Sequence, residues 1–188
     1  MLVVLILALL AQAPAASRRP AATKPDACAL LADADVRAVL GVDVKERQPA
    51  THQARGLLLS QCYLATGTSR SVSIAVAGNT TSVGRTITPR AFWRDQFHGR
   101  DERASEGTGE KREPRRTGET SKPEGETEAR PIAGVGDEAF WSGTRVAGAL
   151  YVLRGNTFIR VSVGGISDEK ERIEKSRQLA LSALARLR

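Results

Sequence analysis

Two short runs of alternating apolar residues, Ala147–Leu153 and Thr157–Val163, form the clearest pattern in the chain. Alternation over this length is typical of strands that have one buried face. Between the runs, Gly155 and Asn156 suit a two-residue type II′ turn, because glycine takes the positive φ that its first position requires. The sequence therefore predicts a β-hairpin here.

The turn also sets the register of the hairpin, since a slip by one residue would mingle apolar and polar side chains on both faces. One face pairs Val152 with Ile159, Leu150 with Val161 and Gly148 with Val163. The other pairs Leu153 with Phe158, Tyr151 with Arg160 and Ala149 with Ser162. We expect the first face to lie in the core and the second, mixed face to be partly exposed.

A second hairpin is predicted earlier in the chain, from Leu57–Ala65 and Ser71–Ala77, with the turn over residues 66–70. Its second run alternates valine and isoleucine with serine and alanine, which indicates a half-buried strand. The preceding segment, Val42–Arg55, contains Pro49 and shows no such alternation, so we expect irregular structure there.

Three helices are predicted. The first begins with Asp33 as N-cap and ends at Gly41. The second is Pro89–Phe97, with proline in its first turn. The third begins with Ser167 as N-cap and runs toward the end of the chain, with Arg172 pointing away from the core. Its predicted inner stripe is Ile173, Ala180, Leu184 and Leu187.

The order of these elements predicts an α+β fold. We expect an antiparallel sheet of four or more strands, built from the two hairpins, with helices packed on one face. Each hairpin follows a helix, so the halves resemble two copies of one α-β-β unit, a possible duplication.

The remaining segments differ in composition. Residues 99–130 contain no valine, isoleucine, leucine or aromatic residue. Such a segment buries too little apolar surface to offset its ordering entropy, which predicts a disordered insert within a single domain, residues 26–188. Residues 17–25 are a polar tether, and residues 1–16 are a signal peptide or an N-terminal anchor.

Export is indicated by the start of the chain. Met1–Leu10 is apolar but shorter than a membrane span, and small residues follow at Ala11-Gln12-Ala13, as at a signal cleavage site. No lysine or arginine precedes the apolar run, which leaves two alternatives: a true start further upstream, or an uncleaved anchor. We expect an exported protein, periplasmic or extracellular.

The two cysteines, Cys28 and Cys62, are predicted to form a disulfide, as isolated pairs in exported proteins commonly do. A catalytic thiol and a metal pair remain the alternatives. No four-ligand zinc pattern is visible, and His52 and His98 lie in loop-like or charged surroundings typical of surface histidines. We predict no metal, no cofactor and no catalytic residue.

The net charge of +7 is dispersed along the chain and not interleaved with aromatic residues, which make up 4% of the chain. Nucleic acid is therefore an unlikely partner. Contact with a membrane is expected only through an uncleaved N-terminus or through the cationic surface.

The segment Gly134–Ala139 matches the dinucleotide-binding pattern G-x-G-x-x-A. That pattern requires a strand before it and a helix after it, whereas strands follow here, so the glycines are expected to form a tight turn. Asp137 and Glu138 are adjacent and point to opposite faces of a strand, which prevents them from acting as a pair of catalytic carboxylates by themselves.

Six residues are candidate ligand or partner contacts: Trp93, Asp137, Glu138, Trp141, Tyr151 and Arg160. For Trp93, packing in the core is the alternative to a stacking platform for bases or sugars.

Four segments carry a family resemblance: residues 26–31 (DACALL), residues 60–62 (SQC), residues 134–141 (GVGDEAFW) and the hairpin at residues 148–165. In these the chain resembles a group of small exported bacterial envelope domains of unknown function, a two-cysteine α+β family. The resemblance implies an envelope location and the Cys28–Cys62 bond. It implies no catalytic residues.

Three functions follow as hypotheses. The first is a non-enzymatic exported domain that binds an envelope partner, which is a protein, a lipid or a cell-wall polymer. The second is a secreted hydrolase that uses Asp137 or Glu138. The third is nucleic-acid binding through dispersed arginine and lysine residues.

Overall fold

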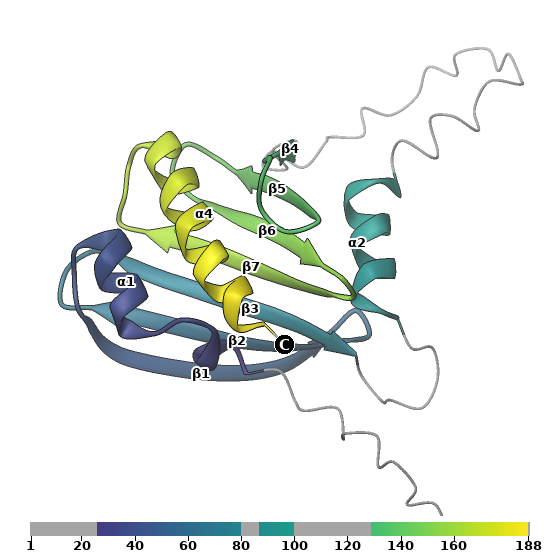
Figure 1. Ribbon diagram of the computed structural model, residues 1–188, viewed down its shortest axis with the longest axis horizontal. Coiled ribbons are helices and arrows are strands. Elements are labelled where there is room, and N and C mark those ends of the chain that lie inside the picture. Colours follow the sequence, from purple (N-terminus) through teal and green to yellow (C-terminus); the bar gives the residue numbers. More distant parts are fainter. Residues whose placement is uncertain (1–25, 80–86, 100–128, 188) are drawn as a thin grey trace, which may run out of the picture.

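The computed structural model describes residues 26–79, 87–99 and 129–187, and its strands form one seven-stranded antiparallel sheet (Figure 1). The strands, in their order across the sheet, are β1 (Val44–Ala54), β2 (Leu57–Thr66), β3 (Ser71–Asn79), β7 (Thr157–Gly164), β6 (Gly148–Arg154), β5 (Glu138–Gly143) and β4 (Arg130–Pro131). The helices are the short 3-10 helix η1 (Ala27–Leu30), α1 (Asp33–Leu40), α2 (Pro89–Phe97) and α4 (Glu169–Arg186). This arrangement confirms the predicted α+β class.

The predicted hairpin is β6 and β7, in the expected register. Leu150 pairs with Val161, Val152 with Ile159, Tyr151 with Arg160 and Leu153 with Phe158. Gly155 has φ +59°, and Asn156 is not among the residues of positive φ, as a type II′ turn requires. Alternation of apolar residues therefore predicted both the turn and the pairing.

The sheet contains two three-stranded meanders, β1–β3 and β5–β7, which meet where β3 pairs with β7, and the short strand β4 extends it beyond β5. The halves correspond in their strands. Their helices differ, because α1 packs with α4 on one face, whereas α2 packs on the other.

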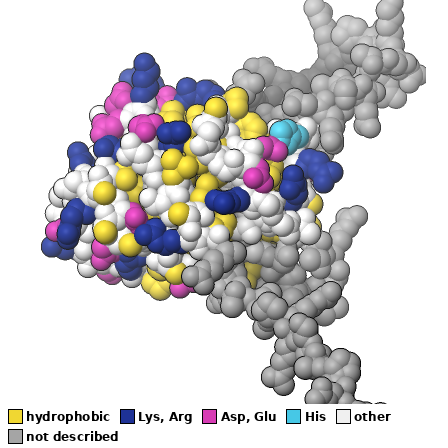
Figure 2. All heavy atoms as spheres, viewed as in Figure 1, with side chains coloured by type: hydrophobic (Ala, Val, Ile, Leu, Met, Phe, Trp, Pro, Cys, Tyr) yellow, Lys and Arg dark blue, Asp and Glu magenta, His cyan; other side chains and the backbone are white. Residues whose placement is uncertain are grey.

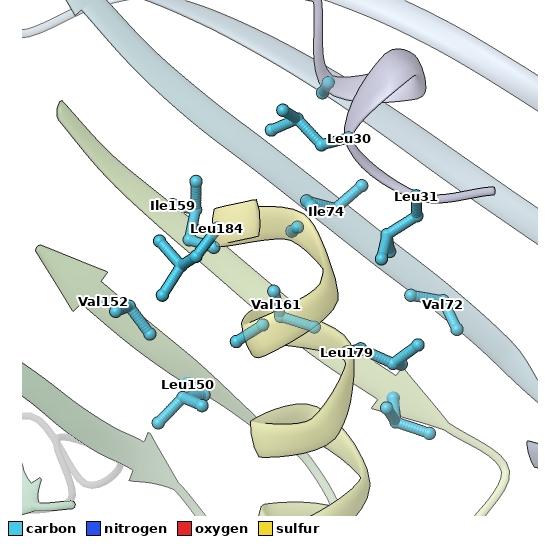
Figure 3. Close-up of a cluster of buried hydrophobic side chains, with 14 of the residues drawn as sticks. Leu30, Leu31, Val72, Ile74, Leu150, Val152, Ile159, Val161, Leu179 and Leu184 are labelled. Carbon is cyan, nitrogen blue, oxygen red and sulfur yellow. The ribbon is translucent and has the colours of Figure 1, made fainter. Parts of the chain in front are cut away.

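The main core lies between the sheet and the helices η1, α1 and α4. Figure 3 shows Leu179 and Leu184 of α4 over Ile159 and Val161, with Leu30 beside them, and these side chains are buried. The same face of the sheet also contributes Val72, Ile74, Leu150 and Val152, which are fully buried. The face predicted to be apolar is therefore the core face.

A second, smaller core lies on the opposite face of the sheet, under α2. Trp93 of α2 packs there with Leu57, Ala77, Leu153 and Phe158. The expectation that the helices share one face holds for α1 and α4, but α2 covers the other face. The aromatic stripe of α2 matches the aromatic residues on that face, which no pattern within the helix itself could indicate.

The prediction of irregular structure over Val42–Arg55 is wrong, because most of this segment forms the edge strand β1. β1 is largely exposed on both faces, so it lacks the alternation that marks half-buried strands. Its turn to β2 has positive φ at both Arg55 (50°) and Gly56 (79°), as in a type I′ turn. Non-glycine residues other than asparagine and aspartate rarely adopt positive φ, so Arg55 gave no sequence signal for this turn.

Two helix starts also differ from the prediction. Ala32, not Asp33, is the N-cap of α1, and its N–H donates to Asp35 Oδ2 at 2.7 Å. Asp168, not Ser167, caps α4 and accepts from Glu171 N–H at 2.7 Å. In both cases a neighbouring carboxylate satisfies an amide of the first turn.

Arg172 is buried, whereas the sequence placed it on the outer side of α4. Its side chain is 1% exposed, and its two terminal nitrogens donate to four backbone carbonyls. These belong to the loop before α4 (Ile166 and Ser167) and to the loop between β5 and β6 (Thr144 and Arg145). The guanidinium ties the two loops together.

The predicted disulfide is confirmed: the sulfurs of Cys28 and Cys62 are 2.01 Å apart. The bond joins η1 to β2 across the edge of the main core, where Ala27 N–H also donates to Ser60 Oγ at 3.0 Å.

The predicted signal peptide or anchor (residues 1–16), the tether (17–25) and most of the insert (99–130) lie outside the described residues. Among the helices within the described ranges, none is long and apolar enough to cross a membrane.

Candidate functional site

The face of the sheet that carries α2 is covered only in part. Beyond the residues under α2, two cross-strand rows of side chains continue across the same face of the sheet, and the first row touches α2 through Tyr151, whose ring meets that of Phe97. The first row is Tyr151, Arg160, Ala75, Gln61 and Ala50, and the second is Ser162, Ser73, Tyr63 and Gln48. We call these two rows the open face.

The centre of the open face carries only small side chains. Ala75, Ser73 and Ser162 lie at its centre and are half-buried between neighbouring strands. Gln61 Nε2 donates to Ser73 Oγ at 3.2 Å. Tyr63 rises at one side of these small residues, and its side chain is 39% exposed.

Arg160 is the only charged side chain in the two rows. Its Nε donates to the Tyr151 hydroxyl at 3.2 Å, and its guanidinium carbon lies 5.8 Å from the centre of the Tyr151 ring. Within the described ranges, its two terminal nitrogens have no hydrogen-bond partner. Tyr151 therefore holds the guanidinium in place while its outer edge remains available to an acceptor.

An aromatic cluster separates the open face from α2. Phe97 stacks on Phe140 with ring centres 4.7 Å apart and meets the edge of Tyr151 at 5.5 Å. Trp93 lies 4.4 Å from Phe97, measured between ring centres. These contacts fix α2 on the sheet and fix the ring on which Arg160 rests.

Glu138, on β5, receives two hydrogen bonds from α2 and the residue after it. Trp93 Nε1 donates to Glu138 Oε2 at 3.0 Å, and His98 Nε2 lies 2.7 Å from the same oxygen. These hydrogen bonds hold the pKa of the Glu138 carboxyl below its ordinary value of 4.5, and the one from Trp93 has the largest effect. The charges of His98 and Arg90 lower the pKa by smaller amounts. Glu138 is therefore ionised at neutral pH and anchors the end of α2.

The anchoring role predicts a pH dependence of stability. A carboxyl whose pKa is depressed by folding contributes stability that is present above its unfolded pKa and lost as the pH falls through its folded pKa. Replacing Glu138 with glutamine should therefore lower the free energy of unfolding more at about pH 6 than at about pH 3. Urea denaturation at both pH values measures the difference. The control is Glu46→Gln on the exposed edge strand, and a Glu138→Gln effect equal at both pH values would contradict the assignment.

Asp137 and the glycines beside it form a turn. Asp137 Oδ2 accepts from Gly155 N–H at 2.7 Å, and Asp137 N–H donates to Leu153 O at 2.8 Å. Gly134 and Gly136 both have positive φ, and a Cβ on Gly136 would lie 2.4 Å from Leu153 O. The G-x-G-x-x-A pattern thus serves a turn packed against β6, as the sequence predicted.

The six candidate contacts fall in four places. Tyr151 and Arg160 lie together on the open face, and Trp93 and Glu138 lie beside it under α2. Asp137 is in the turn that precedes β5. Trp141 is buried in the main core, where its Nε1 donates to Glu169 Oε1 at 2.9 Å.

Sequence analysis missed four members of this region: His98, Gln61, Ser73 and Tyr63. The alternation in β3 already placed Ser73 opposite the core, so a signal existed for it. The contact of His98 with Glu138 joins residues 40 apart in the sequence, and no local pattern marks it.

The rest of the described structure offers fewer groups that could bind a ligand or a metal ion. Within the three described ranges there is no group of three or more histidine, cysteine, aspartate or glutamate side chains able to hold a metal ion. A hollow of about 350 Å³ lies beside α4, lined by Asp137, Arg154 and Leu181 among others. Its charged groups are engaged, since Asp137 binds Gly155 N–H and Arg154 donates to Leu184 O at 3.4 Å.

The face covered by α1 and α4 shows no concentration of one charge. Figure 2 shows lysine and arginine side chains interspersed with aspartate and glutamate over this face.

Comparison with protein-family models, with curated proteins and with solved structures finds no match to this chain.

Proposed function

We propose that the chain is an exported, non-enzymatic domain that binds an envelope partner through its open face. The observation that carries the proposal is the open face and its one charged side chain, Arg160, whose terminal nitrogens have no partner in the described part of the chain. A flat polar sheet face with an oriented cation is suited to binding an extended partner.

Export is supported by the Cys28–Cys62 disulfide, because such bonds persist in oxidising compartments. The apolar start of the chain and the small residues after it support the same location. Cell fractionation with alkylation of free thiols tests this point. Recovery in the cytoplasm with both thiols free would contradict export.

The geometry gives less support to the two alternative functions, a secreted hydrolase and a nucleic-acid-binding protein. Asp137 and Glu138 are both held by structural partners: Asp137, in the turn before β5, accepts from Gly155 N–H, and Glu138, on β5, accepts from Trp93 Nε1. Nucleic-acid binding draws its affinity from several phosphate contacts, whereas the open face carries a single cation.

Substituting Ala75 tests the proposed surface. Ala75 pairs with Gln61 on one side and with Arg160 on the other, so Ala75→Glu places a carboxylate next to the guanidinium and fills the flat centre. Sedimentation with purified cell-wall material and, separately, with envelope membrane vesicles measures binding. We expect binding to fall at least about tenfold, which corresponds to about 1.4 kcal/mol.

The matched control is Leu181→Glu, which adds the same charge at an exposed position of α4 on the opposite face. This variant should bind as the unsubstituted protein does. Equal binding by the Ala75→Glu protein, with its fold verified by circular dichroism, would contradict the proposed surface.

A further inference from the structure

We propose that the partner of the open face is a polysaccharide bearing carboxylate groups, and that Arg160 binds those carboxylates. This inference rests on the proposed function and names the class of partner. It follows from three features of the open face: the orientation of its guanidinium, the polar groups around it, and the kinds of side chain that the two rows lack.

The guanidinium is arranged for a carboxylate. Tyr151 occupies Nε and one face of the group, which leaves the two terminal nitrogens as a planar pair of donors. Such a pair matches the two oxygens of a carboxylate, and the resulting bidentate contact is stronger than a neutral hydrogen bond. Arg160 is also half-buried, so water screens the contact less than it would at a fully exposed site.

No acidic side chain of the open face competes for Arg160, since the two rows contain only one charged residue. Glu138, on the same side of the sheet, is engaged with Trp93 and His98. The two rows are therefore complementary in charge to an anionic partner, and the carboxylate that borders them, Glu46, accepts from Gln48 Nε2 at 3.0 Å on the edge strand, three strands away from Arg160.

The polar groups next to Arg160 fit sugar hydroxyls. Ser73, Ser162 and Tyr63 carry hydroxyls, and Gln61 carries an amide. Ser162 Oγ already donates to Gly148 O at 2.7 Å and Gln61 Nε2 to Ser73 Oγ at 3.2 Å, so Ser162 offers a sugar its acceptor side only. They lie on adjacent strands, which are about 4.8 Å apart, close to the length of one hexose unit. The exposed ring of Tyr63 offers an apolar surface to the C–H face of a sugar.

A protein or a membrane fits this surface less well. Protein interfaces depend on aromatic or aliphatic anchors inserted into pockets, and the centre of the open face is flat with small side chains. Anionic membranes attract clusters of lysine and arginine beside apolar side chains, whereas the two rows hold one arginine and no aliphatic residue larger than alanine.

The test uses the full chain and short oligomers of galacturonic acid as the probe, with calorimetry to measure affinity. We expect Arg160→Gln to weaken binding at least about tenfold. Arg160→Lys should also weaken it, because lysine keeps the charge but not the paired donors. The control Arg177→Gln, on α4 over the opposite face, should leave affinity unchanged. The methyl ester of the same oligomers, which has no carboxylate, should bind as weakly as the Arg160→Gln protein binds the acid.

Three results would overturn the inference: equal affinity for the acid and its methyl ester, equal affinity of the Arg160→Gln protein, or tighter binding to polyglutamate or to phosphatidylglycerol vesicles than to the oligomers. The last result would favour a peptide or a membrane as partner. If galacturonate fails to bind but Ala75→Glu still abolishes binding to envelope material, this inference falls and the proposed function stands. If Ala75→Glu leaves envelope binding intact, the proposed function itself falls.

Discussion

Replacing Arg172 with leucine is expected to lower the free energy of unfolding by about 3 kcal/mol or more. The guanidinium is buried and donates to four carbonyl oxygens at 2.8 to 2.9 Å. Leucine fills part of the volume but leaves all four carbonyls without their donor, and each buried unsatisfied polar group costs about 1–3 kcal/mol. Relaxation of the two loops toward water offsets part of that sum. Urea denaturation measures the change.

The control for this substitution is Arg177→Ala on the same helix. The guanidinium of Arg177 is partly exposed and lies 3.9 Å from Glu174, so its loss should change stability by less than about 0.5 kcal/mol. Arg172→Lys should give an intermediate loss, because an ammonium has three donors for four carbonyls. An Arg172→Leu protein as stable as the unsubstituted one would show that the two loops need no tie.

Removing the disulfide is expected to lower the free energy of unfolding by about 4 kcal/mol. The bond closes a loop over a sequence separation of 34 residues, and its loss restores that freedom to the unfolded chain. The double substitution Cys28→Ala and Cys62→Ala, compared with the oxidised protein in guanidinium chloride, measures the effect. Cys62 is fully buried, so the smaller side chain should add to the loss.

Reduction of the unsubstituted protein provides the comparison, because it opens the bond without removing either sulfur. The reduced protein should lie between the oxidised protein and the double variant in stability. If oxidised and reduced proteins unfold at the same denaturant concentration, the link between η1 and β2 contributes nothing to the fold.

The sequence predicted those parts of the fold whose side chains alternate between core and solvent. Leu150, Val152, Ile159 and Val161 specify their own register, because any slip exposes them to water. The edge strand β1 has no buried face, so its sequence shows no alternation of apolar and polar residues. It forms a strand because it pairs with β2. Its existence is a tertiary effect.

In the candidate site, too, the sequence predicted the positions set by alternation along a strand, but not those set by packing between distant segments. Tyr151 and Arg160 were predicted to share the mixed face, and they do. The face on which α2 packs, and with it the contact of His98 with Glu138, depends on which of two apolar surfaces receives the aromatic stripe of α2. Arg172 was misplaced for a similar reason, since the four carbonyls that stabilise its burial come from loops.

The proposed function depends most on the open face being the surface that meets the partner. Tyr63 on the open face and Leu181 on α4 are 39% and 41% exposed, so they report on opposite faces with nearly equal access to solvent. Hydroxyl-radical labelling of the protein, free and bound to envelope material, compares their reactivity. Binding through the open face should protect Tyr63 and leave Leu181 as reactive as in the free protein. Protection of Leu181 with Tyr63 unchanged would contradict it.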